Sequence, residues 1–206
     1  RFAMVKARVV TGDKKAIARL EEILSPFVYR RYLDYGAIEA LRDLKRKINL
    51  EVARKGMHDN IKLGQGGIRE LEFIVQSFQL IRGGRLQGLQ IQSFHQALEQ
   101  IALEGLLAED EKVLLWNAYE FLRNTEHVLQ AIDDKQTQQL PVDELERIRV
   151  ALVLGELSWD SFLARLDSHR ENVHRCFSNM IADDEVVDSN QQQNAGLQWQ
   201  PEMNSD

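Results

Sequence analysis

The chain contains one cysteine and three prolines among its 206 residues. Because Cys176 is the single cysteine, no disulfide can form within the chain. The prolines, Pro26, Pro141 and Pro201, leave long stretches in which helices can run without interruption. No apolar run approaches the roughly 18 residues that a membrane-spanning helix needs, and no charged and then apolar leader opens the chain. We therefore expect a cytoplasmic protein without membrane association.

Acidic charge is concentrated at the end of the chain. The net charge is −6, and residues 183–206 contain six acidic residues and no lysine or arginine, so residues 1–182 are neutral overall. This stretch also includes NQQQN and has few apolar residues, which predicts a disordered linker over 183–206. Residues 30–56 hold eight basic residues against four acidic ones, which either meet phosphates or form a solvated helix face. We expect no nucleic-acid partner.

Apolar residues recur at spacings of three and four almost throughout, and no stretch alternates with period two for long enough to predict a strand. The sequence therefore predicts an all-α bundle of about seven or eight helices. The opening RFAMVKARVV also looks helical, as if the chain started partway along an element of a larger protein. The other predicted helices are 13–24, stopped before Pro26, then 35–55, 68–82, 93–104, 109–135, 143–154 and 159–181, with a short segment at 27–33.

A glycine-rich stretch, NIKLGQGGIRELE, precedes the helix predicted at 68–82. Gly64, Gly66 and Gly67 permit backbone angles closed to other residues, so the loop could present bare amides to a phosphate at the helix N-terminus, with Lys62 adding a charge. The spacing matches neither the Walker lysine motif nor the dinucleotide fingerprint. A flexible start to a helix is the alternative interpretation, and the loop spacing favours it.

Polar residues form a stripe along the helix that follows, at spacings of three and four: Arg69, Glu72, Gln76 and Gln79. The rest of this helix is apolar nearly all round, so we expect the stripe to face a cleft or a partner rather than open water. The candidate cleft residues are Lys62, Gly64, Gly66, Gly67, Arg69 and Glu72.

A second polar stripe lies on the helix predicted at 109–135, with Arg123, His127, Gln130 and Asp134 on one face. His127 has no second histidine at metal-binding spacing and no paired nucleophile, so a surface or hydrogen-bonded role is the simpler interpretation. Asp133 and Asp134 are adjacent on a helix and rarely reach one ion together. We predict no catalytic residue and no metal site within the chain, and assign Cys176 to the core.

Three stretches taken together carry a family resemblance: RFAMVKARVVTGD, IKLGQGGIRELEFIVQSFQLIRGG and TEHVLQAIDDKQTQQLP. They resemble the bifunctional glutamine synthetase adenylyltransferase/adenylyl-removing enzymes, at the end of the N-terminal, adenylyl-removing half. In that family a nucleotidyltransferase domain of the DNA polymerase β type precedes a helical domain, which is shared in kind with PII uridylyltransferases. The resemblance implies that residues 1–12 are the last helix of the nucleotidyltransferase domain, 13–182 the helical domain and 183–206 the linker.

The resemblance also implies an activity for the parent enzyme. That enzyme removes AMP from a tyrosine of glutamine synthetase by phosphorolysis, yielding ADP, and its other half attaches AMP from ATP, with Mg²⁺ as cofactor and PII and glutamine as reporters of nitrogen status. The nucleotidyltransferase signature of Gly-Ser and Asp-x-Asp is absent from this sequence. We therefore expect this chain alone to be inactive and to bind neither Mg²⁺ nor ATP or ADP, with its cleft facing the upstream domain. The alternative is a regulatory module that docks PII or the partner half.

The direction of the two polar stripes distinguishes these two interpretations. Stripes facing the side from which residues 1–10 emerge favour a shared cleft, and stripes facing away favour a docking module.

Overall fold

The computed structural model describes the backbone of residues 1–30, 35–134 and 136–194. These residues form α-helices and short turns, with no strand among them, so the all-α prediction is confirmed. The α-helices are α1 (Lys14–Val28), α2 (Tyr35–Lys55), α3 (Ile68–Arg82), α4 (Phe94–Leu103), α5 (Glu109–Asp133), α6 (Glu144–Val153) and α7 (Trp159–Asn194). Three 3-10 turns, η1 (Phe2–Met4), η2 (Met57–Asp59) and η3 (Gln87–Leu89), complete the described elements. No described helix is long and apolar enough to cross a membrane.

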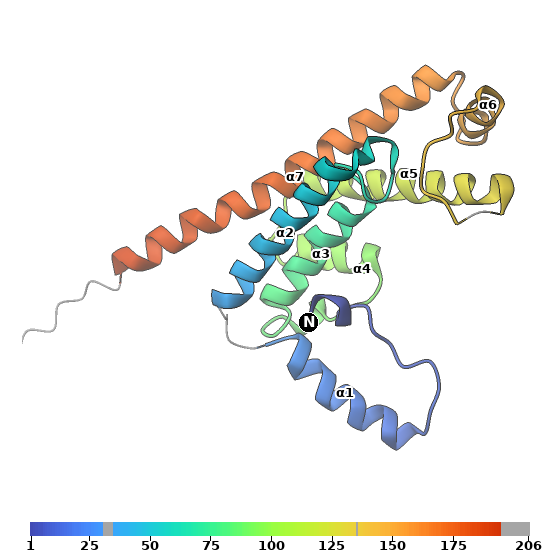
Figure 1. Cartoon of the computed structure of the whole chain (residues 1–206). Helices are drawn as coiled ribbons and strands as arrows, with labels where there is room; N and C mark the ends of the chain where they lie inside the picture. The colour runs from blue at the N-terminus through green and yellow to red at the C-terminus, as the bar shows by residue number, and fades with distance from the viewer. Residues whose placement is uncertain (31–34, 135, 195–206) are drawn as a thin grey trace, which may run out of the picture.

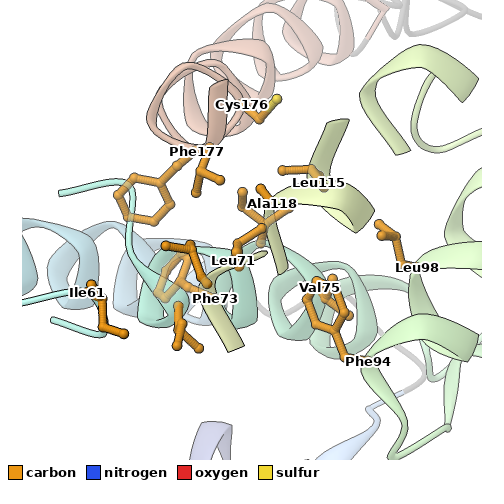
Figure 2. Packing of buried hydrophobic residues seen from close by; sticks show 14 of the residues in the cluster. Ile61, Leu71, Phe73, Val75, Phe94, Leu98, Leu115, Ala118, Cys176 and Phe177 are labelled. Carbon is orange, nitrogen blue, oxygen red and sulfur yellow. The ribbon is translucent and has the colours of Figure 1, made fainter. Parts of the chain in front are cut away.

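Helix α3 is the central element, since it packs against α2, α4, α5 and α7 (Figure 1). Helix α7 runs diagonally along the bundle, α6 packs against α5 and α7 at one end, and α1 extends away from this group (Figure 1). The core forms where α3, α4, α5 and α7 meet, and Figure 2 shows Leu71, Val75, Leu98, Ala118 and Phe177 within it. Cys176 is buried there, which confirms its assignment to the core.

Side-chain caps explain where several helices begin. The Asp13 carboxylate accepts hydrogen bonds from the backbone amides of Lys15 and Ala16, at 2.9 and 3.2 Å, and starts α1. Asp143 accepts the Glu146 amide in the same way at the start of α6. Helix α3 has no side-chain cap and begins directly after Gly67. Its start therefore depends on the geometry of the glycine loop.

Helix α1 continues through Pro26 to Val28, whereas the sequence predicted its end near residue 24. Pro26 lacks the amide that would bond the Glu22 carbonyl, but Glu22 is exposed, so water can satisfy that carbonyl. Val28 is buried, and the Tyr29 amide donates to the Ser25 carbonyl at 2.8 Å. These interactions stabilise the last turn despite the proline. The short segment predicted at 27–33 lies partly outside the described residues.

The helix predicted over residues 1–12 is not formed. The structure has only the 3-10 turn η1 in this segment. This segment is held by contacts with the bundle instead. Val5 is buried, the Phe2 and Phe73 rings lie 5.3 Å apart, and the Arg1 guanidinium donates to the Val28 carbonyl at 3.0 Å. Tertiary packing therefore overrides the helical pattern of the sequence at this end.

Helix α7 remains helical to Asn194, beyond the end predicted at residue 181. The linker predicted from residue 183 falls on this helix up to Asn194. Its remainder, residues 195–206, lies outside the described residues.

Candidate functional site

The glycine loop is closed by its own hydrogen bonds. The Asn60 side-chain oxygen accepts the amides of Lys62 and Leu63 at 3.0 and 2.7 Å. The amides of Gly64, Gly67, Ile68 and Arg69 donate to the carbonyls of Asn60, Gly64, Ile61 and Lys62, respectively. The Gly66 backbone donates to the Glu70 carboxylate. The amides of all three glycines are thus engaged within the protein, and that of Gly66 meets a carboxylate of the same chain.

Close packing explains why the loop contains glycines. Gly66 has φ +67°, and a Cβ atom there would lie 2.2 Å from the Arg170 carbonyl oxygen on α7. At Gly64 a Cβ atom would lie 2.5 Å from the Asn60 carbonyl oxygen, and at Gly67 it would lie 2.7 Å from that of Ile61. The glycines therefore let the loop approach α7 and fold back on itself.

Arg170 holds the loop from the other side of this contact. Its guanidinium donates to the carbonyls of His58 and Asn60 at 2.8 and 3.0 Å. Burial lowers the pKa of Arg170, and the nearby carboxylates of Asp167 and Asp59 partly oppose that effect. Arg170 is thus a structural clamp between α7 and the residues that precede α3.

Glu70, in the first turn of α3, is a buried carboxylate that sequence analysis did not single out. It is 1% exposed and lies 3.2 Å from the His174 ring nitrogen Nδ1. Burial raises the pKa of Glu70, although the hydrogen bonds from His174 and from the Gly66 backbone act in the opposite direction. His174 borders a cavity of about 670 Å³ beside the loop, which gives water access to its ring. Glu70 links the loop, α3 and α7 in one cluster.

We predict that Glu70→Gln changes how stability depends on pH. Because the folded-state pKa of Glu70 is raised, its contribution to the free energy of unfolding is complete below its ordinary value of 4.5 and is lost as the pH rises through the raised value. Glutamine keeps the size and an acceptor oxygen but cannot ionise. In urea titrations from pH 4 to 8, Glu70→Gln should therefore gain stability relative to the unsubstituted protein as the pH rises. Parallel pH profiles for the two proteins would contradict this prediction.

The two polar stripes meet through an ion-pair network. The Arg123 guanidinium lies 2.6 Å from the Glu72 carboxylate and 2.7 Å from the Glu126 carboxylate. Lys62 lies 3.3 Å from Glu126, whose side chain is 5% exposed. Burial alone would raise the pKa of Glu126, but the hydrogen bonds and charges of Arg123 and Lys62 bring it below its usual range. Lys62, Glu72 and Arg123 come from separate elements, and Glu126, which was not predicted from the sequence, connects Lys62 with Arg123.

The charges of this ion-pair network reach Lys6 in the N-terminal segment. The Lys6 ammonium donates to the Gln92 carbonyl at 2.6 Å, and the Gln92 amide donates to the Ala7 carbonyl at 2.7 Å. Burial lowers the pKa of Lys6, the charge of Glu72 raises it, and that of Arg123 lowers it. The charges of Glu72 and Arg123, one from each stripe, therefore act on Lys6 of the N-terminal segment.

The other residues of the stripes have different surroundings. Arg69 pairs with Glu51 of α2 at 3.3 Å, and both side chains are about a third exposed. Gln79 is fully buried and donates to the carbonyls of Leu89 and Ile91, so it holds the segment around η3. His127 and Asp134 are exposed and Gln130 is half-buried. Among the described residues, no hydrogen bond or ion pair links these three to the network around Arg123.

The described residues do not fit a magnesium site. No three His, Cys, Asp or Glu side chains among them are grouped so that they could hold a metal ion. The two carboxylates of the ion-pair network, Glu72 and Glu126, are both engaged by Arg123.

Comparisons with known proteins agree with the motifs. The family model for GlnD PII-uridylyltransferase matches residues 42–181, which include the glycine loop and both stripes. A relative from Pseudomonas putida is 51% identical over 201 residues, covering 98% of this chain and 21% of the relative. Relatives from Psychromonas ingrahamii and Pseudomonas aeruginosa are 47% and 49% identical, covering 97% and 98% of this chain and 21% of each relative.

All three relatives are named bifunctional glutamine synthetase adenylyltransferase/adenylyl-removing enzyme. The chain spans about a fifth of their length. The resemblance stated from the sequence motifs is thereby confirmed. The chain is similar in sequence to these bifunctional enzymes. Because the family model matches more than half of the chain, the chain belongs to the GlnD PII-uridylyltransferase family.

Proposed function

We propose that this chain is the helical domain beside the adenylyl-removing site of an enzyme that removes AMP from, and adds AMP to, glutamine synthetase. The identity of about half of all positions to enzymes with that name is the observation that carries the proposal. The electrostatic effect of Glu72 and Arg123 on Lys6 supports it, since an upstream nucleotidyltransferase domain would continue from the side of the bundle where Lys6 lies. That domain would bind Mg²⁺ and ATP or ADP. The whole enzyme would work in the cytoplasm, and PII would regulate it.

Within this site Arg69 is the cation best able to meet a phosphoryl group. Its partner Glu51 is 3.3 Å away and both side chains are partly exposed, so the pair contributes little to stability and can exchange at low cost. Arg123 is instead held by two carboxylates. We therefore assign Arg69 the contact with phosphate or with the adenylylated loop. Arg123, Glu72 and Lys62 position the surface around it, and Gly64, Gly66 and Gly67 shape the loop.

The test is Arg69→Ala in the long enzyme, assayed for both activities. Loss of a charge-assisted phosphate contact worth about 1.5 to 3 kcal/mol should lower the rate of phosphate-dependent AMP removal roughly tenfold or more. The adenylylating activity should change much less. The folded state should be nearly as stable as before, because the ion pair with Glu51 is partly exposed.

Arg46→Ala is the matched control for this experiment. Arg46 is an exposed arginine of α2 that pairs with Asp43 one turn away, so its removal should leave both activities unchanged. Unchanged removal kinetics and phosphate dependence in Arg69→Ala would refute the assigned role and leave the loop as a helix start. The 206-residue chain alone should release no ADP from adenylylated glutamine synthetase.

A further inference from the structure

Helix α6 exposes a stripe of large apolar side chains. We define the α6 stripe as the exposed apolar residues of this helix together with one flanking residue on each side. Its members and their exposed fractions are Val142 87%, Leu145 55%, Ile148 47%, Leu152 63%, Val153 68% and Leu157 98%. Single exposed apolar residues are ordinary, but a contiguous group marks an interaction surface.

The opposite face of α6 packs against the rest of the bundle. Val150 and Ala151 are buried, and α6 contacts α5 and α7 through that side. Helix α6 lies at one end of the bundle, away from the N-terminal segment (Figure 1). The α6 stripe is thus separate from the surface assigned to AMP removal.

A positive charge stands in the middle of the stripe. Arg149 is exposed and lies four residues after Leu145 and three before Leu152, so it shares their side of the helix. No ion pair or hydrogen bond of its side chain is found among the described residues. Acidic residues, Glu144 and Glu146, stand at the beginning of the helix. A surface complementary to this stripe would have apolar side chains around a central carboxylate.

Two other occupants fit this pattern less well. In a two-fold pairing of α6 with a second copy, the Arg149 side chains would approach each other because they lie near the middle of the stripe. An anionic membrane surface would meet Glu144 and Glu146 at the edge. The long relatives, by contrast, contain about four fifths of their chain outside the matched segment, which is an ample source of helices.

We propose that the α6 stripe docks an amphipathic helix with a central carboxylate, which belongs to the part of the long enzyme outside this segment. The apolar side chains of that helix cover Leu145, Ile148 and Leu152, and its carboxylate pairs with Arg149. This interface joins the helical domain to another domain of the same polypeptide. It does not depend on the role proposed for Arg69.

The experiment measures maleimide labelling of Leu152→Cys in two proteins. One is the 206-residue chain, and the other is the long Pseudomonas putida enzyme carrying this chain in place of its matched segment. The labelling rate of each protein is divided by the rate of the same protein unfolded in urea, which corrects for the intrinsic reactivity of the cysteine. Mass spectrometry identifies the labelled peptide. We expect labelling at least tenfold slower in the long enzyme than in the chain. Equal rates would overturn the proposal, and so would slow, concentration-dependent labelling of the chain alone, which would identify a second copy as the occupant.

Two substitutions of Arg149 test whether its positive charge is needed for docking. In the long enzyme, Arg149→Glu should restore fast labelling of Leu152→Cys, whereas Arg149→Lys should preserve protection. Protection that persists in Arg149→Glu would overturn the acidic partner. Sedimentation of the chain with vesicles containing phosphatidylserine would also overturn the proposal, because it would identify a membrane as the occupant.

Discussion

Gly66→Ala should lower the free energy of unfolding by about 3 to 5 kcal/mol, because two penalties combine at this position. The left-handed backbone at φ +67° disfavours any residue with a Cβ atom, and that atom would lie 2.2 Å from the Arg170 carbonyl oxygen. Separation of the loop from α7 would break the hydrogen bonds that Arg170 donates to the His58 and Asn60 carbonyls. Urea denaturation of the 206-residue chain measures this loss.

Gly105→Ala provides the matched control for backbone strain. Gly105 has a similar φ of +69°, but nothing lies within 4 Å of the Cβ position. Its substitution should cost only about 1 to 2 kcal/mol, which is the penalty of the left-handed conformation alone. Equal losses in the two variants would show that close packing on α7 contributes nothing and would contradict the role assigned to Gly66.

The second large effect is expected at Arg170. Arg170→Met keeps an unbranched apolar stem but removes the donors to the His58 and Asn60 carbonyls. Loss of two hydrogen bonds from a charged group should lower the free energy of unfolding by about 2 to 4 kcal/mol, after allowance for the lower desolvation cost of methionine. The same urea titrations measure this change.

Arg175→Met is the control for Arg170→Met. Arg175 lies on the same helix, is exposed and bonds the side chain of nearby Asn172. Its substitution should change stability by no more than about 0.5 kcal/mol. If Arg170→Met is as mild as this control, Arg170 does not clamp the loop.

Helices with strong periodicity were predictable with close boundaries. The predictions 35–55 and 68–82 coincide with α2 and α3, because apolar spacing and the flanking glycines are local properties of the sequence. The predictions failed where distant contacts decide the conformation. Residues 1–12 have a helical pattern, but Phe2 packs on Phe73 of α3 and Val5 is buried. Helix α1 passes through Pro26 because Val28 is buried.

The sequence identified the polar stripes but not the contacts that connect them. The polar stripes follow from helical spacing, yet the pair of Glu72 and Arg123 joins residues 51 positions apart. Glu70 and Glu126 resemble any other helical glutamate in the sequence, and only burial distinguishes them. Glu70 meets His174 across 104 positions. One clue was present, since a helix that is apolar nearly all round must bury some of its polar residues.

The sequence by itself determined the all-α architecture, the position of the glycine loop and the polar faces of α3 and α5, because each depends on the periodicity and backbone freedom of neighbouring residues. Only the tertiary structure decided what the glycines are for. Their amides are engaged within the chain, and Gly66 lies against the backbone of Arg170 on α7. Such contacts depend on which helices pack together and at what separation, and no local pattern encodes that arrangement.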